Sequence, residues 1–264
     1  MYEDPQKILN YLPIRKNKLE NDYIEHLWNA FLALETSEST GKSFSIMPFH
    51  LLFMLALQYK ILRISQIQTE SCNLFFCGVA GRSKDVLLSD EKSVFDIALI
   101  NERTIPEIFQ LVGLDTKGIK SIKDLIDQRN NTLAHAKGGI EIRPEEKVDK
   151  YIKTLEAIQK SFSQINQDLI NTWLYDIQGC EDAEQYLENN FLIYRLTYRD
   201  FSEIIKILLG APQLDFDQWE QVVNKGLELI YDQTIEALKI IAKDNLDKDK
   251  VFNAVKVLEE NGEL

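Results

Sequence analysis

Three side chains suited to acid–base and anion chemistry lie close together in residues 127–139, whose sequence is DQRNNTLAHAKGG. They are Arg129, Asn130 and His135. A histidine titrates near neutral pH and can therefore accept or donate a proton. An arginine keeps its positive charge and pairs with anions through several N–H donors. On a helix, Asn131 and His135 form an i, i+4 pair that can fix the orientation of the imidazole.

The helix that must carry these residues is predicted over 122–136, with Ser121 as its N-cap and two glycines after its end. Arg129 lies on an otherwise apolar face of this helix, with Ile122, Ile126, Leu133 and Ala136. A guanidinium cannot lose its proton to escape an apolar site, so burying it without a partner is costly. We therefore expect a carboxylate partner for Arg129, or else a polar cavity or a subunit interface at this point.

The spacing of apolar residues predicts helices in almost all the rest of the chain, so the expected fold class is all-α. Steps of three and four residues indicate helices over 23–34, 48–63, 144–177, 183–209, 216–241 and 248–259. Within the long helix that begins at Pro144, apolar residues from Val148 to Leu169 form a continuous stripe. Such a stripe suits lengthwise packing on another helix or on a second subunit. Gly179 is the best candidate for a boundary between a core and a C-terminal part.

Three further features have the residue types of functional sites, and each is explained better by structure. The GKS sequence at 41–43 is similar to the end of a phosphate-binding loop, but Thr36 replaces the required first glycine and no strand precedes it. His26 forms an i, i+4 pair with Asp22, which predicts a contact on the helix surface. His50 lies in an apolar helix, where we expect a hydrogen-bonded histidine of the core or of an interface.

Composition limits the partners of the protein. The chain of 264 residues has a net charge of −12, which argues against unspecific coating of nucleic acid, because such binding depends on Lys and Arg. A nucleic-acid site would have to be a local basic pocket or one assembled between subunits. The three cysteines show neither a disulfide framework nor the spacing of a zinc site. We expect buried thiols and no bound metal.

The sequence also bears on localisation. The N-terminal residues lack the basic and apolar pattern of a signal peptide. The most apolar stretch, residues 44–64, is interrupted by one proline and four polar residues, namely Pro48, His50, Gln58, Lys60 and Arg63. This favours a buried helix over a membrane span. We therefore expect a cytoplasmic protein with no membrane contact.

The segment from Arg129 to His135 resembles the Arg-x4-6-His motif of the HEPN domain family. Five residues separate the two side chains, and Asn130 occupies the position where the family often has Asn, Asp or His. The Ala before the His, the position late on a helix and the long following helix are also similar to the family. The resemblance covers about residues 15–178. It implies a HEPN-like helical bundle core over residues 1–178 and leaves 179–264 as an additional C-terminal helical region.

This resemblance implies a metal-independent endoribonuclease that needs no cofactor and acts as a homodimer, with the two motifs facing each other. His135 would serve as general base or acid, Arg129 would bind the phosphate, and Asn130 would position the phosphate or the histidine. From their proximity in the sequence, and not from the resemblance, Lys137 and Arg143 could add local positive potential. The implied substrate is RNA, and the implied role is that of a toxin or antiviral-defence effector restrained by a neutralising or regulatory protein. The alternative is a non-catalytic HEPN-like scaffold that binds a partner protein.

Overall fold

The computed structural model describes residues 3–13, 17–37, 40–79, 84–89, 92–130, 144–177, 197, 199 and 200. The chain divides into two compact units, Met1–Phe162 and Ser163–Leu264. The described residues form helices and turns and contain no strand, so the predicted all-α fold class is confirmed. The predicted boundary at Gly179 and the helices predicted after it lie outside the described residues.

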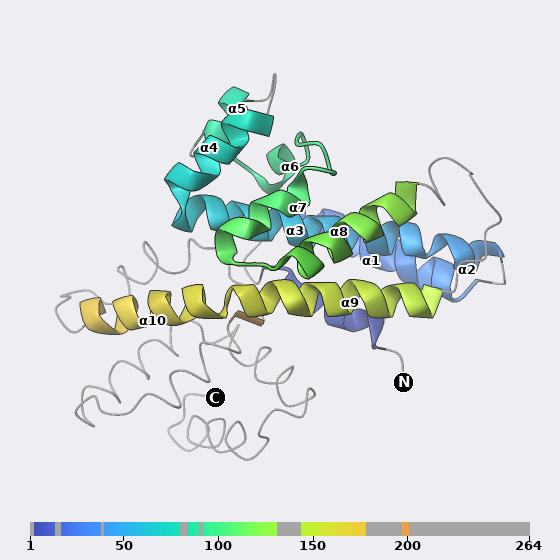
Figure 1. Ribbon diagram of the computed structural model, residues 1–264. Coiled ribbons are helices and arrows are strands. Elements are labelled where there is room, and N and C mark those ends of the chain that lie inside the picture. The colour runs from blue at the N-terminus through green and yellow to red at the C-terminus, as the bar shows by residue number, and fades with distance from the viewer. Residues whose placement is uncertain are drawn as a thin grey trace, which may run out of the picture. The chain divides into compact units, whose positions relative to one another are not determined.

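The described residues of the first unit form α-helices and two short 3-10 helices (Figure 1). In chain order they are η1 (Pro5–Tyr11), α1 (Lys18–Glu35), α2 (Thr40–Phe44), α3 (Ile46–Ile67), α4 (Thr69–Val79), α5 (Lys84–Leu88), α6 (Val94–Ile97), α7 (Ile105–Ile108), η3 (Phe109–Val112), α8 (Thr116–Arg129) and α9 (Pro144–Ser161).

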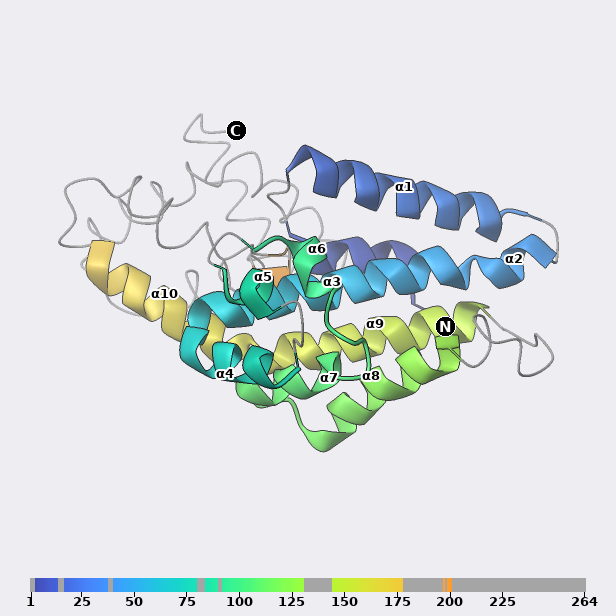
Figure 2. The same ribbon diagram turned by 90° about the horizontal axis from the view of Figure 1, so that it is seen from above.

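Helix α3 is the centre of this unit. It packs against α1 on one side, α9 on another, and α4 and α6 further along its length (Figure 2). Because neighbours surround it, α3 buries polar residues such as Gln58 together with its apolar residues, of which Phe49 and Phe53 are fully buried. Residues Lys42–Ile67 are long and apolar enough to span a membrane, but most of that stretch is buried inside the unit. The sequence prediction of a buried helix is confirmed for α3, whereas Phe44 belongs to α2 and is exposed.

Helix α8 begins earlier than the sequence predicted. Its N-cap is Asp115, whose side chain accepts a hydrogen bond of 2.7 Å from the backbone N–H of Gly118, so the predicted cap at Ser121 is wrong. Gly113 has a positive φ of 77° and ends the preceding 3-10 helix. Gly118 lies inside α8, where an added Cβ would come within 2.6 Å of the Leu114 side chain. Close packing of Leu114 therefore explains a glycine within a helix.

Helix α9 carries the first half of the predicted apolar stripe. Its buried residues Val148, Tyr151, Leu155 and Ile158 pack within the first unit, where α9 contacts α3, α8 and η1. The helix ends at a turn on Phe162, in which the backbone N–H of Phe162 donates to the carbonyl of Gln159 over 3.0 Å. The prediction of one continuous helix over 144–177 is therefore wrong.

The second unit begins with α10 (Ser163–Ile177). Its described residues include a buried polar network around Asp200. One carboxylate oxygen of Asp200 accepts from the side chain of Asn166 over 3.2 Å, and the other accepts from the backbone N–H and hydroxyl of Thr197 over 2.9 and 2.8 Å. These bonds link two segments of the unit that are distant in sequence.

Candidate functional site

The predicted motif falls at the end of α8. Arg129 is the last residue of the helix, and Asn130 is its C-cap, with helical backbone angles (φ −61°, ψ −44°). The backbone N–H of Asn130 donates to the carbonyls of Ile126 and Asp127. His135 and Asn131 lie outside the described residues, as do Lys137 and Arg143. Two of the three predicted catalytic residues, Arg129 and Asn130, can therefore be placed.

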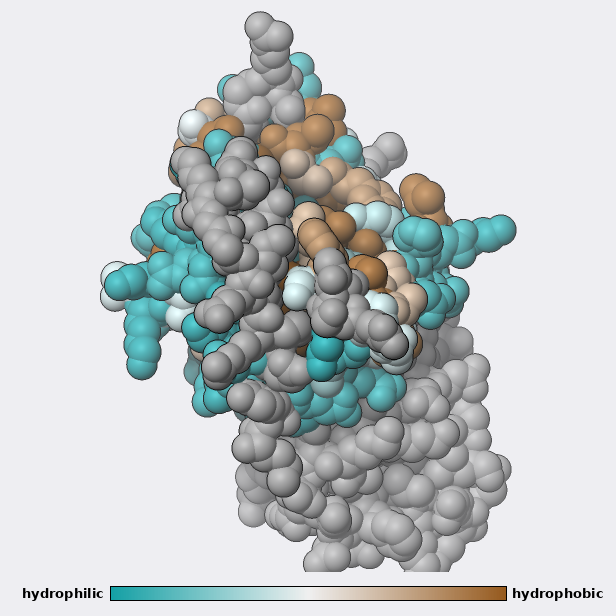
Figure 3. Space-filling model, turned by 90° about the vertical axis from the view of Figure 1, so that its right-hand side faces the viewer, coloured by the Kyte–Doolittle hydropathy of each residue, from teal (hydrophilic) through white to brown (hydrophobic). Residues whose placement is uncertain are grey.

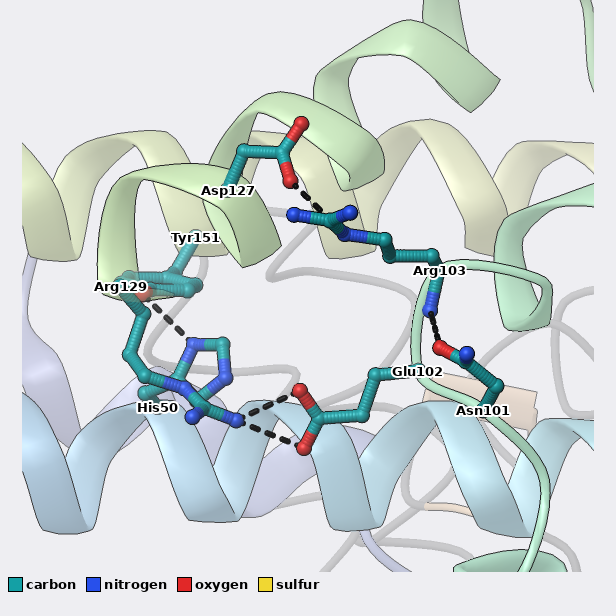
Figure 4. Close-up of polar contacts among 7 residues, drawn as sticks. All are labelled: His50, Asn101, Glu102, Arg103, Asp127, Arg129 and Tyr151. Atoms are coloured by element: carbon teal, nitrogen blue, oxygen red, sulfur yellow. Dashed lines mark hydrogen bonds and ion pairs between the residues drawn. The ribbon is translucent and has the colours of Figure 1, made fainter. Parts of the chain in front are cut away.

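Arg129 meets the carboxylate partner that its apolar surroundings require. Its Nη2 donates to both carboxylate oxygens of Glu102, over 2.7 and 2.5 Å (Figure 4). The Arg129 side chain is 18% exposed and that of Glu102 is 37% exposed. The ion pair therefore lies at the edge of the interior, where the desolvation of the guanidinium is compensated and the carboxylate still reaches water.

Two more ion pairs align the segment before α7 with α8. Arg103 pairs with Asp127 over 3.5 Å, and Glu107 on α7 pairs with Lys123. Residues 102, 103 and 107 thus pair with residues 129, 127 and 123 of α8, so the two segments run antiparallel. The side chain of Asn101 accepts from the backbone N–H of Arg103 over 3.0 Å and so stiffens the turn that presents Glu102 (Figure 4). The backbone of the turn that carries Glu102 is therefore held against α8 by its neighbours.

A second polar pair lies in the core beside Arg129. Nδ1 of His50 on α3 and the hydroxyl of Tyr151 on α9 share a hydrogen bond of 2.8 Å (Figure 4). His50 is 1% exposed, and its Nε2 has no hydrogen-bond partner among the described residues. The Nε of Arg129 is likewise buried, with no hydrogen-bond partner in the described ranges. Nε2 of His50 and Nε of Arg129 are therefore both buried without a hydrogen bond to any described residue.

The environment keeps both members of this pair uncharged. Burial, and then the positive charge of Arg129, lower the pKa of His50 from 6.5 to about 3. Burial also raises the pKa of Tyr151, and the charge of Arg129 opposes this shift. A histidine with so low a pKa is neutral at physiological pH and is a poor general base. The prediction of a hydrogen-bonded core histidine at position 50 is confirmed.

One further cation lies near the motif. Nζ of Lys147, in the first turns of α9, donates to the side chain of Gln128 on α8 over 2.6 Å. Burial, and then the neighbouring Lys150, lower the pKa of Lys147, while Glu146 opposes the shift. Lys147 therefore adds positive charge beside Gln128, the residue that precedes Arg129 in the sequence, in spite of the acidic overall composition.

The other sequence candidates have structural explanations. The GKS sequence lies in the short helix α2, which follows helix α1, so a phosphate-binding loop after a strand is excluded. His26 and Asp22 are both exposed on α1, as expected for a surface pair. Cys72 is buried, which raises the pKa of its thiol to about 12, but Cys77 is exposed, contrary to the expectation of buried thiols. The described residues hold no group of three or more His, Cys, Asp or Glu that could bind a metal ion.

Sequence reasoning missed several residues of this site. Glu102 lies in a polar turn, where no apolar periodicity indicates which residue its side chain contacts. The sequence predicted a carboxylate partner for Arg129 but not its position. Tyr151 was counted among the apolar residues of the stripe on α9. Its hydroxyl group was the only indication in the sequence that it has a polar partner. Lys147 was not considered because it lies in a charged stretch, PEEKVDK, that is typical of a helix start.

Apolar residues also lie on the surface of the protein. Figure 3 views the side on which α2 lies, and apolar residues gather in the upper part of this face between hydrophilic flanks. Phe44 on α2 and Leu51 on α3 are exposed large apolar residues. Surface of this kind is suited to contact with another chain.

No known protein family, curated protein or solved structure matches this chain. Its described residues form an all-α fold in which an arginine is held by a carboxylate, beside a histidine–tyrosine pair, at the edge of the helical core.

Proposed function

We propose that the chain is a metal-independent endoribonuclease of the HEPN type, with Arg129, Asn130 and His135 as its catalytic residues. The observation that carries the proposal is the placement of Arg129, whose charge is held on the apolar face of α8 and whose Nε has no hydrogen-bond partner in the described part of the chain. A cation kept at such a position is suited to an anionic ligand. His135 follows within two helical turns in the sequence.

The proposed reaction is an internal phosphoryl transfer. The RNA 2′-hydroxyl attacks the adjacent phosphorus, a new O2′–P bond forms and the P–O5′ bond breaks. His135 removes the 2′-hydroxyl proton or protonates the leaving O5′, because an imidazole with an ordinary pKa can do either near pH 7. Arg129 binds the phosphate oxygens and stabilises their developing charge. Asn130 positions the phosphate or the histidine. The products are a 2′,3′-cyclic phosphate and a 5′-hydroxyl.

The proposal includes a homodimer. The residues that support it differ from those that suggested it in the sequence. The first reason and half of the second are met within one chain, since Glu102 pairs with Arg129 and the part of the stripe on α9 packs inside the first unit. The support is now two exposed large apolar side chains, Phe44 and Leu51, which a second subunit would cover. Light scattering at micromolar protein should give twice the chain mass of 30.6 kDa, and a monomer alone would contradict the dimer.

The second candidate function is a non-catalytic helical scaffold that binds a partner protein. The ion pair of Arg129 with Glu102 favours it, because the charge of Arg129 is already compensated within the chain. In the enzymatic case the protein acts in the cytoplasm as a toxin or antiviral-defence effector, and a neutralising or regulatory protein restrains it.

RNA cleavage separates the two candidates. Purified protein is incubated with total RNA in EDTA, together with His135→Ala and, as a matched control, His26→Ala, which removes an exposed histidine of α1. The nuclease predicts cleavage by the wild type and His26→Ala, and loss of cleavage in a folded His135→Ala. Intact RNA in every reaction favours the scaffold.

A further inference from the structure

The contact between Glu102 and Arg129 uses one particular nitrogen. A guanidinium can bind two oxygens of one anion along either of two edges, of which one is formed by Nη1 and Nη2 and the other by Nε and Nη2. Nη2 belongs to both edges. Both carboxylate oxygens of Glu102 lie on Nη2, at 2.7 and 2.5 Å. Glu102 therefore occupies the nitrogen that any two-point contact with a phosphate requires.

The pairing with Glu102 leaves Arg129 incompletely satisfied. Its Nε is buried and lacks a hydrogen-bond partner among the described residues. Buried N–H groups without an acceptor are rare, and each one calls for an explanation. A phosphate on the edge formed by Nε and Nη2 would supply the missing acceptor, whereas the carboxylate of Glu102 accepts from Nη2 and leaves Nε without one.

Glu102 is also the member of the pair that can move. Its side chain is about twice as exposed as that of Arg129, at 37% against 18%. The turn that carries it is fastened independently, by the ion pair of Arg103 with Asp127 and by the side chain of Asn101. The carboxylate can therefore rotate into water without any movement of the backbone.

We propose that Glu102 is an internal competitor for the phosphate site on Arg129. In the ligand-free chain its carboxylate holds the guanidinium in place and blocks both of its two-point edges. RNA binds when a phosphate displaces this carboxylate from Nη2 and reaches Nε as well. The inference rests on the proposed function in that the displacing phosphate belongs to RNA. The turn 101–104, which carries Glu102, would then set the affinity of the chain for RNA.

The test measures binding without cleavage. The probe is a fluorescein-labelled oligonucleotide made of 2′-O-methyl ribonucleotides, which lack the attacking 2′-hydroxyl, and fluorescence anisotropy reports its Kd. Glu102→Gln should bind about fivefold more tightly than the wild type, since the competing charge is lost. Glu107→Gln is the matched control, because it removes the same charge from an ion pair with α8 that does not involve Arg129. Its Kd should stay within about twofold of the wild type.

The gain must act through Arg129. In an Arg129→Ala background, Glu102→Gln should therefore change the Kd no more than the control does. If Glu102→Gln is unstable by thermal unfolding, Glu102→Asp replaces it, because the shorter side chain keeps the charge but reaches Nη2 less well, and it should also bind more tightly. Equal or weaker binding by the folded variants overturns the competition, as does binding that does not depend on Arg129. If binding behaves as expected but no variant cleaves unmodified RNA, the competition stands and the nuclease assignment fails.

Discussion

Helix α3 and its neighbours bury cations in two regions, and these regions differ in how they hold the charge. Near the end of α9, Lys60 and Arg63 lie over the ring of Phe162, at 4.8 and 5.5 Å from its centroid, and Lys60 also donates to Gln159 over 2.7 Å. Arg63 is only 1% exposed. At the end of α8, Arg129 is 18% exposed and is held by a carboxylate that reaches water.

The difference separates a structural cation from one that is suited to binding. An aromatic ring cannot leave the core, so Lys60 and Arg63 are fixed parts of the packing. A half-exposed carboxylate can rotate away, so Arg129 can exchange its partner for another anion. The same residue type therefore serves the fold in one region and, as we propose, ligand binding in the other.

The largest expected effect on stability belongs to the buried region. Arg63→Ala should lower the free energy of unfolding by about 3–5 kcal/mol, because it removes a large buried side chain and the charge that its surroundings compensate. Urea unfolding at pH 7 measures this loss. A change below about 1 kcal/mol would show that Arg63 is not a structural cation and would remove the contrast with Arg129.

A smaller effect, and one that depends on pH, is expected at His50. Its pKa is lowered to about 3 in the folded state, so between about pH 3 and 6.5 the unfolded chain binds one proton more than the folded chain. Stability from this residue is therefore fully present above pH 6.5 and is lost as the pH falls, by about 1.4 kcal/mol per pH unit. Urea unfolding at pH 7, 6 and 5 should show a shallower loss for His50→Gln than for the wild type. Parallel profiles would mean that His50 is accessible to protons in the folded state.

The smallest loss of stability is expected at the proposed site itself. Arg129→Ala should cost about 1–2 kcal/mol, since the remaining Glu102 is free to turn into water and no unpaired charge stays buried. Unfolding of this variant is measured beside that of Arg63→Ala under the same conditions. Losses of equal size would make Arg129 another structural cation and would favour the scaffold over the enzyme.

Much of the fold followed from apolar spacing, because a helix that buries one face must repeat its apolar residues every three or four positions. Helix α3 is the clearest case, and its burial was predicted although polar residues interrupt it. The exact ends of the helices were harder to predict, because several neighbouring residues can cap or end a helix. Asp115 caps α8 in place of Ser121, and a turn at Phe162 ends α9 within a stripe that continues in the sequence.

The sequence predicted that Arg129 needs a carboxylate partner, but it did not predict which residue supplies it. A guanidinium on an apolar face requires a carboxylate, and Arg129 has one. That the carboxylate is Glu102 depends on how the turn before α7 lies against α8, and no local pattern encodes such a long-range contact. The link between His50 and Tyr151 likewise depends on how α3 crosses α9.

The most direct test of the nuclease proposal is a single cleavage event at a chosen bond. The substrate is an oligonucleotide of 2′-O-methyl nucleotides with one unmodified ribonucleotide, incubated with the protein in EDTA and analysed by mass spectrometry. The account predicts one cut, directly after the ribonucleotide, which leaves a 2′,3′-cyclic phosphate, and a rate about 10²–10⁴-fold lower for His135→Ala. Cleavage at the modified positions, a requirement for magnesium, or an unchanged rate for His135→Ala would contradict it.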